Sequence, residues 1–300
     1  MSSRHSAVGV IGVGRIGSGL ATNLLTNGFR VAVFDQDAEK TLRMAESGAT
    51  AVDSPAAMVG SCSHIFLSLH AAESVNAVLF GAHGLAASRP DGPLAVIDTT
   101  TIAPEQSRAF HDRLAPLRID YLDAPITGGE GGARSGTLYF MVGGDCEVFN
   151  TCKPLFEAVG RRAVHVGTSG AGATAKMVNQ LLMMAHMAGA AEALAYVEAQ
   201  DIDFDRVLEA INPQLSEDPY VNSLNKLRKT VVSEPDTVIP ADECHYTDLF
   251  LKDARCILEL GTNQPVTTVA ARILDAAIKS GTNGPFPWTF KTGLAALQQD

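Results

Sequence analysis

The sequence predicts an α/β protein with an N-terminal doubly wound sheet, an all-α C-terminal domain and a long helix that joins them. The first half alternates short apolar runs with helical patterns, which is typical of a parallel sheet covered by helices on both faces. From about 173 to 199 the chain reads as one helix rich in Ala, Met and Leu, and every segment beyond it reads as helical. We therefore expect two domains, residues 1–165 and 166–300.

The expected elements follow in a regular order. Continuous apolar runs such as 65–69 indicate strands buried on both faces of the sheet, and Pro104 stands at a favourable helix start. Strands are expected at 7–11, 31–34, 65–69, 94–98, 119–124 and 137–143. Helices are expected at 39–47, 105–114, 204–211, 223–231, 242–260 and 267–279.

A glycine-rich turn follows the first expected strand, with the sequence Gly12-Val13-Gly14-Arg15-Ile16-Gly17. Gly12 permits the tight turn, Gly14 lets the backbone approach a pyrophosphate, and Gly17 allows close packing of helix on strand. The helix that follows presents its free N–H groups to the phosphates. Because strand, glycines, helix and second strand occur in register, we expect a Rossmann domain that binds a dinucleotide.

The second strand ends on Asp35, about 20 residues after the glycines, where a carboxylate can hydrogen-bond the hydroxyls of the adenine ribose. A carboxylate there repels a 2′-phosphate, and Gln36 offers no cation to hold one. Two further acidic residues, Asp37 and Glu39, follow closely. We therefore expect NAD as the cofactor, with NADP less favoured.

Composition limits the partners. A formal net charge of −10 without a basic run argues against nucleic acid. Five cysteines form no CxxC pair, and the N-terminus runs directly into the first strand, so we expect a cytoplasmic protein. The longest charge-free apolar stretch, 177–191, is too short to cross a membrane. His64, His83, His111 and His165 have no companions at metal-ligand spacing, so no metal site is expected.

Two segments carry candidate chemistry. Thr127-Gly128-Gly129 comes just after a strand, where a hydroxyl and two backbone N–H groups can form a small cup for a carboxylate. A flexible loop is the alternative interpretation. On the long helix, Lys176, Asn179 and Gln180 share one face.

Lys176 falls in or near the first turn of that helix. The helix dipole disfavours a cation there, so the position suits a lysine that gives up its proton near neutral pH. An ordinary surface lysine is the alternative, which the apolar character of the surrounding helix disfavours.

Together these motifs resemble the β-hydroxyacid dehydrogenase family, of the 3-hydroxyisobutyrate dehydrogenase and tartronate semialdehyde reductase type, over nearly the whole chain. The resemblance implies that the glycine-rich turn is the dinucleotide fingerprint and that Thr101, in Asp98-Thr99-Thr100-Thr101-Ile102, touches NAD. Leu69-His70 lies where the family has a Leu-Pro pair beside the cofactor, so His70 is a departure.

The same resemblance implies that Lys176 is the catalytic lysine and that Asn179 and Gln180 act beside it. Thr127 stands in place of the family's serine in the substrate-binding segment. Lys252, in a Lys-Asp pair, is implied to reach cofactor and substrate from the helical domain. The segment 242–246 departs from the more apolar approach of the relatives.

The expected function is that of an NAD-dependent oxidoreductase that interconverts a small 3-hydroxy acid and its semialdehyde. A reductase of tartronate semialdehyde, succinic semialdehyde or glyoxylate is a second interpretation with the same fold. A non-catalytic dinucleotide-binding protein is a third, which the presence of Lys176 disfavours. The expected partners are a small carboxylate substrate and copies of the same chain, as a homodimer or homotetramer.

Overall fold

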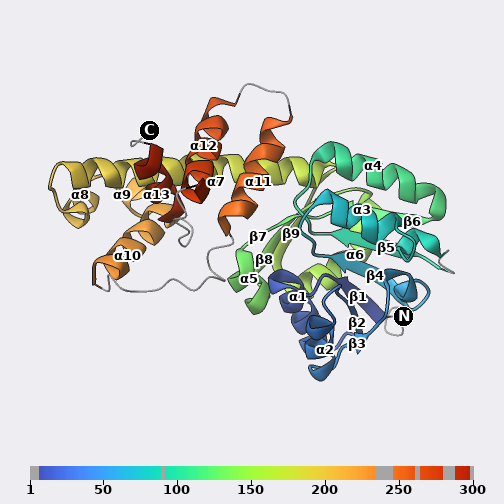
Figure 1. Ribbon diagram of the computed structural model, residues 1–300. Coiled ribbons are helices and arrows are strands. Elements are labelled where there is room, and N and C mark those ends of the chain that lie inside the picture. The colour runs from blue at the N-terminus through green and yellow to red at the C-terminus, as the bar shows by residue number, and fades with distance from the viewer. Residues whose placement is uncertain (1–6, 89–91, 234–245, 261–263, 280–287, 298–300) are drawn as a thin grey trace. The chain divides into compact units, whose positions relative to one another are not determined.

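The computed structural model describes residues 7–88, 92–233, 246–260, 264–279 and 288–297 (Figure 1). The chain divides into two compact units, Met1–Lys176 and Met177–Asp300. The first holds a sheet covered by helices. In the second, the described residues form helices and no strands. The predicted fold class, a Rossmann sheet followed by an all-α domain, is confirmed.

The sheet of the first unit has nine strands in the order β3-β2-β1-β4-β5-β6-β8-β7, with β9 paired to β8. The strands from β3 to β6 pair in parallel, whereas β8 runs antiparallel to β6 and β7. Their bounds are β1 (Ala7–Ile11), β2 (Val31–Phe34), β3 (Thr50–Ala51), β4 (Cys62–Leu67), β5 (Leu94–Asp98), β6 (Ile119–Asp123), β7 (Ile126–Thr127), β8 (Leu138–Gly143) and β9 (Gly160–Gly167). Strand order reverses at β1, so β1 and β4 border the crevice where such sheets bind ligands.

Two hydrophobic clusters lie on the two faces of the sheet because successive strand residues point to opposite faces. Val10 and Val33 join the cluster that α1 (Arg15–Thr26) and α6 (Cys146–Val159) cover. Ile11 and Ala32 join the opposite cluster, which α3 (Ala72–Phe80) and α4 (Pro104–Leu114) cover (Figure 1). This two-faced burial explains the continuous apolar runs in the sequence.

Two further α-helices lie wholly in this unit, beside three short 3-10 helices at Pro55–Met58, Leu85–Ala87 and Ala115–Leu117. One, α2 (Ala38–Glu46), follows the second strand as predicted. The other, α5 (Gly129–Ser135), lies in the glycine-rich segment after Thr127, where the sequence indicated a cup or a flexible loop. The strands β3, β7 and β9 and the helices α3 and α6 were also not predicted.

The predicted long helix is present as α7 (Ala171–Ala199), which begins in the first unit and continues into the second. The other helices of the second unit are α8 (Phe204–Ala210), α9 (Pro213–Ser216), α10 (Pro219–Ser233), α11 (Tyr246–Leu258), α12 (Pro265–Lys279) and α13 (Trp288–Leu297). Side chains of α7, α11 and α12, such as Met184, Ala254 and Ile273, form its core. Residues 242–245, the start of a predicted helix, lie outside the described residues.

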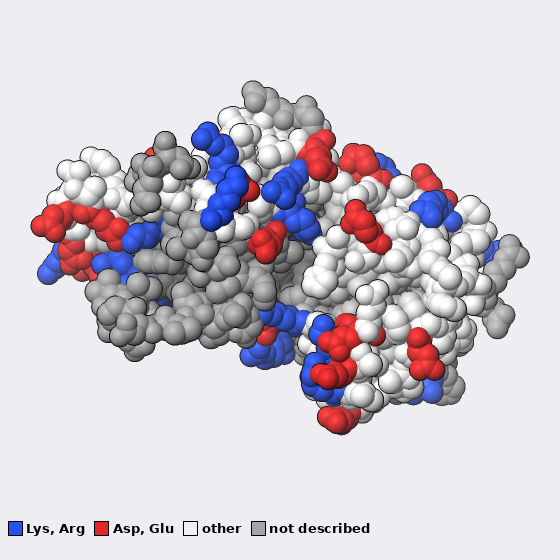
Figure 2. Space-filling view, in the orientation of Figure 1, with Lys and Arg blue, Asp and Glu red and all other residues white. Residues whose placement is uncertain are grey.

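The surface carries charges of both signs. On the face shown in Figure 2, basic side chains lie beside acidic ones and most of the described surface is uncharged. Among the described residues, no helix combines the length and the apolar character needed to cross a bilayer.

Candidate active site

The glycine-rich turn between β1 and α1 has the geometry that dinucleotide binding requires. Gly12 has a φ of +86°, and a Cβ on it would lie 2.3 Å from the carbonyl oxygen of Ser68. A Cβ on Gly17 would lie 1.8 Å from the carbonyl oxygen of Gly12, so both positions accept only glycine. Gly14, in contrast, faces open space, because a Cβ on it would have no neighbour within 4 Å. It offers no side chain to cap α1, so this helix start suits a pyrophosphate.

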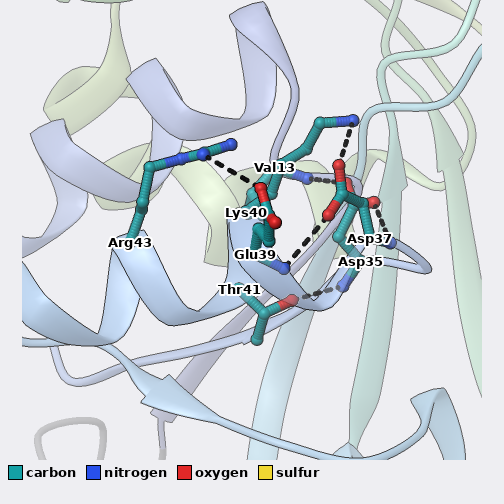
Figure 3. A network of polar contacts seen from close by, with 7 residues as sticks. All are labelled: Val13, Asp35, Asp37, Glu39, Lys40, Thr41 and Arg43. Carbon is teal, nitrogen blue, oxygen red and sulfur yellow. Dashed lines mark hydrogen bonds and ion pairs between the residues drawn. The ribbon is translucent and has the colours of Figure 1, made fainter.

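Asp35 is held beside this turn (Figure 3). Its Oδ2 accepts the N–H of Val13 at 2.9 Å, and its Oδ1 accepts the N–H of Asp37 at 2.9 Å. The backbone N–H of Asp35 donates to the hydroxyl of Thr41 at 3.1 Å. The carboxylate is therefore fixed at the end of β2, next to the backbone expected to carry the phosphates.

Two cations on α2 follow Asp35 in the chain, and the sequence interpretation did not consider them. Lys40 Nζ is 3.5 Å from Asp37 Oδ2, and Arg43 is 3.9 Å from Glu39 Oε2 (Figure 3). Each basic group thus lies beside an acidic one on the same helix or at its start.

The ends of β4 and β5 are tied together by threonines. The Thr99 hydroxyl donates to the carbonyl oxygen of Leu67 at 2.7 Å, and the N–H of Leu69 donates to the hydroxyl of Thr100 at 3.2 Å. Thr101 is half-buried at this edge, and His70 is exposed. The residues expected to contact the cofactor therefore lie at the carboxyl edge of the sheet, next to the crevice between β1 and β4 where the strand order reverses.

A buried carboxyl group lies beneath this edge. Asp98 ends β5, is 0% exposed, and accepts hydrogen bonds from the N–H of Thr100 at 2.9 Å and from the hydroxyl of Tyr121 at 2.7 Å. Burial raises the pKa of Asp98 to about 6 although these donors lower it. Sequence reasoning did not single out this group as titratable, and its place at the end of an apolar strand was the available signal.

The proposed carboxylate cup has a backbone that favours its two glycines. Gly128 has a φ of +121° and Gly129 a φ of +58°, a region that other residues rarely adopt. Both glycines are exposed, and Thr127 is half-buried. A Cβ on Gly129 would have no neighbour within 4 Å, so open space adjoins its backbone.

The helix that follows the cup is fixed to the helix that follows the cofactor turn. Asn23 of α1 donates through Nδ2 to the carbonyl oxygen of Ala133 in α5 at 2.8 Å. Glu130 lies between two arginines, 2.6 Å from Arg134 and 3.9 Å from Arg15. The cup and the dinucleotide turn are thus parts of one packed arrangement.

Lys176 lies in the second turn of α7, as its sixth residue, rather than in the first turn. Its side chain is buried, at 8% exposure, and Nζ donates to the carbonyl oxygen of Ile126 at 2.8 Å. The amine is therefore held next to Thr127. The expectation that the helix dipole disfavours a cation at Lys176 is therefore wrong. The carboxylate of Asp123 accepts hydrogen bonds at the start of α7 and offsets the positive end of the dipole.

In the second unit, Gln180 is buried and donates through Nε2 to Asp253 Oδ2. Asn179 Nδ2 donates to Gln180 Oε1 at 3.1 Å, and Lys252 Nζ lies 3.2 Å from Asp253 Oδ1. Asp253, at 2% exposure, thus joins the three predicted residues of this unit. Sequence reasoning named this aspartate only as the partner of Lys252 in a Lys-Asp pair and did not consider its contacts. The described part of the chain contains no group of three or more potential metal ligands.

Comparison with known proteins connects this geometry to a family. Residues 7–167 match the profile of the NAD-binding domain of 6-phosphogluconate dehydrogenase. Residues 170–284 match a profile described as the NAD-binding domain of NADP-dependent 3-hydroxyisobutyrate dehydrogenase. The two profiles together cover most of the chain.

Similar proteins carry related names. A 3-hydroxyisobutyrate dehydrogenase of Pseudomonas aeruginosa is 41% identical over 188 residues, which are 63% of each chain, so the match spans less than two thirds of that relative. A 2-hydroxy-3-oxopropionate reductase of Escherichia coli is 35% identical over 68% of this chain and 69% of its own length. The crystal structure of a 3-hydroxyisobutyrate dehydrogenase from Salmonella typhimurium superposes with a TM-score of 0.78 at 25% identity, over 95% of this chain and 99% of that one. The chain therefore belongs to the β-hydroxyacid dehydrogenase family of NAD(P)-dependent oxidoreductases.

Proposed function

We propose that the protein is an NAD-dependent oxidoreductase that interconverts a small 3-hydroxy acid and its semialdehyde. The observation that carries this proposal is the placement of Lys176. Its buried amine bonds the carbonyl oxygen of Ile126, the residue directly before the Thr127–Gly129 cup. A proton-transfer group thus lies beside a site suited to a carboxylate.

The chemistry follows from the lone pair of a neutral amine. Lys176 can donate one hydrogen to Ile126 and still accept the proton of the substrate hydroxyl as the carbinol is oxidised. In the reverse direction the ammonium returns that proton to the carbonyl oxygen. A nicotinamide dinucleotide held by residues 12–17 would supply the hydride chemistry. The protein supplies orientation and the proton.

The cup sets the class of substrate. The Thr127 hydroxyl and the N–H groups of Gly128 and Gly129 are proposed to hold one carboxylate, which the positive φ of both glycines and the exposed backbone support. With the carboxylate there, a hydroxyl one carbon beyond the α-carbon suits the nearby amine. We therefore propose a monocarboxylate with a 3-hydroxyl group.

The cofactor is proposed to be NAD rather than NADP, bound by residues 12–17, Asp35, Leu69, His70 and Thr101. Support comes from the fixed carboxylate of Asp35 and from the acidic neighbours of Lys40 and Arg43. A 2′-phosphate would be repelled by the first and would compete with acidic groups for the cations.

Asn179, Gln180 and Lys252 are proposed as site residues of the helical unit. Asn179 or Gln180 would hydrogen-bond the reacting oxygen or fix Lys176, and Lys252 would contact cofactor and substrate. The contacts of Asp253 with Gln180 and Lys252 support one role for it, because a buried carboxylate that touches both can orient both.

Further proposals concern organisation. A functional boundary near residue 165 is supported by the two family profiles, of which one ends at 167 and the other begins at 170, although the compact units divide after Lys176. A homodimer or homotetramer is supported by exposed apolar side chains on α7, where Val178 and Leu182 are each 55% exposed. A cytoplasmic location is supported by the buried, unbridged thiols of Cys62 and Cys152.

The test is a screen of wild-type protein against small 3-hydroxy acids with NAD and NADP, and against the corresponding semialdehydes and glyoxylate with the reduced cofactors. We expect oxidation of a 3-hydroxy monocarboxylate that is faster with NAD. Faster turnover of a semialdehyde or of glyoxylate would favour the reductase interpretation. Tight cofactor binding without turnover of any compound would contradict the proposal and favour a non-catalytic dinucleotide-binding protein.

A further inference from the structure

We infer that Asp123 is a positioning residue for Lys176, acting through the first turn of α7. The inference rests on the proposed function, because it assigns to Asp123 the placement of the proposed proton-transfer group. Asp123 ends β6, four residues before the Thr127–Gly129 cup, and its contacts point to a structural task.

The carboxylate of Asp123 is engaged with the start of α7. Its Oδ1 accepts the N–H of Gly170 at 2.8 Å, and its Oδ2 accepts the N–H of Ala173 at 2.8 Å. The residue is 2% exposed. Both oxygens thus face helix amides, and a substrate has no access to them. Asp123 is a cap on the helix that carries the lysine, from a strand end 47 and 50 residues earlier in the chain.

A second contact closes a small ring between the same two segments. Three residues after Asp123, the carbonyl oxygen of Ile126 accepts a hydrogen bond from Lys176 Nζ at 2.8 Å. Three residues before Lys176, Ala173 binds the carboxylate. The start of α7 and the segment that leads into the cup are therefore connected by two sets of hydrogen bonds. One set is made by the carboxylate of Asp123 and the other by the amine of Lys176.

Close backbone packing leaves α7 little freedom to adopt another position while the carboxylate holds it. A Cβ on Gly172 would lie 2.3 Å from the carbonyl oxygen of Asp123 and 2.4 Å from that of Met141. A Cβ on Gly143 would lie 2.7 Å from Asp123 Oδ1. Glycine at both positions lets the helix start, the carboxylate and β8 approach one another, so a small change at Asp123 should move the turn that leads to Lys176.

The test replaces Asp123 with asparagine, which keeps the shape but removes the charge and turns one acceptor into a donor that faces a helix N–H. The matched control is Asp145→Asn. Asp145 caps α6 in the same unit through the N–H groups of Glu147 and Val148, at 2.8 and 3.0 Å, and has no part in the site. We expect Asp123→Asn to lower kcat by roughly tenfold or more at saturating substrate, as misplacement of a catalytic group does. The Kd for NAD should be unchanged, and Asp145→Asn should keep wild-type kcat.

A second readout does not depend on activity. Acetylation of Lys176 by an amine-reactive reagent, followed by peptide mass spectrometry, reports how well the amine is held in its buried position. We expect faster labelling of Lys176 in Asp123→Asn than in wild type or in Asp145→Asn. If wild type has no dehydrogenase activity but the labelling differs as expected, the proposed function fails and the positioning role stands. If Asp123→Asn folds with wild-type kcat and wild-type labelling, the positioning role is refuted.

Asp123→Glu covers the case in which the asparagine variant does not fold. Glutamate keeps the anionic cap but adds one methylene group, which displaces the first turn of α7. We expect a lower kcat and faster labelling of Lys176 with an unchanged Kd for NAD. Wild-type values of kcat and labelling in this variant would overturn the inference.

Discussion

The buried carboxyl group of Asp98 should make the stability of the protein depend on pH in an unusual direction. Burial raises its pKa from 3.8 to about 6 in the folded state. In the unfolded chain the group ionises near its ordinary value, so between these two pH values the folded state binds more protons than the unfolded state. The contribution of Asp98 to the free energy of unfolding is therefore fully present below about pH 4 and is lost as pH rises through about 6.

The magnitude follows from the same values. A rise in pKa from 3.8 to about 6 corresponds to about 3 kcal/mol of stability lost across this interval. Asp98→Asn removes the titration but keeps an oxygen that can accept the N–H of Thr100. Other carboxyl groups titrate in both proteins, so the difference between wild type and variant isolates Asp98.

The assay is urea unfolding followed by circular dichroism at intervals from about pH 4 to 7.5. We expect the stability of wild type, relative to Asp98→Asn, to fall by about 3 kcal/mol between about pH 4 and 6.5 and to stay level above that. Tyr121→Phe removes the hydroxyl that donates to Asp98 at 2.7 Å, so the fall should extend to higher pH in that variant. Parallel stability curves for wild type and Asp98→Asn would refute the reasoning.

Three further predictions concern cofactor and substrate. Because the carboxylate of Asp35 repels a 2′-phosphate, kcat/KM should be at least about tenfold higher with NAD than with NADP, a difference of about 1.4 kcal/mol. Steady-state kinetics that favour NADP would contradict the role given to Asp35. Thr127→Val keeps the shape of the cup and removes its hydroxyl, so KM for the acid should rise roughly ten- to a hundredfold, the loss of one charge-assisted hydrogen bond of about 1.5–3 kcal/mol; an unchanged KM would exclude the hydroxyl as a carboxylate ligand. An amide analogue of the substrate should be turned over poorly by wild type and be almost indifferent to Thr127→Val, whereas equal activity on acid and amide would contradict the carboxylate cup.

The features that the sequence predicted well depend on local requirements. In the turn at residues 12–17, glycine is required where a Cβ would lie within 2.3 Å of a backbone oxygen. These positions are close together in the sequence, so the pattern of glycines can be recognised without the structure. The long helix was predicted from 173 to 199 and runs from Ala171 to Ala199, because its composition is uniformly helical. Composition did not predict α5, because its three glycines disfavour a helix in sequence terms. In the structure this short helix forms a hydrogen bond with α1.

The features that the sequence did not reveal depend on contacts between distant residues. The carboxylate of Asp123 meets amides 47 and 50 residues later, and Gln180 meets Asp253, which is 73 residues away. No periodicity in the chain indicates such pairs, because they arise only when elements that are distant in the sequence pack together in the fold. Lys176 was identified as the candidate base from the sequence. The residue that caps its helix, Asp123, could be identified only from the structure.

The central claim is that Lys176 transfers the proton, and Lys176→Ala tests it most directly. Single-turnover and steady-state kinetics would be measured with the best substrate from the screen, together with the Kd for NAD by fluorescence titration. Loss of a general acid–base group should lower kcat by roughly 10²–10⁴-fold while cofactor binding stays nearly intact. A variant that binds NAD normally and keeps about a tenth or more of the wild-type kcat would contradict the account, because Lys176 would then not be the proton-transfer group.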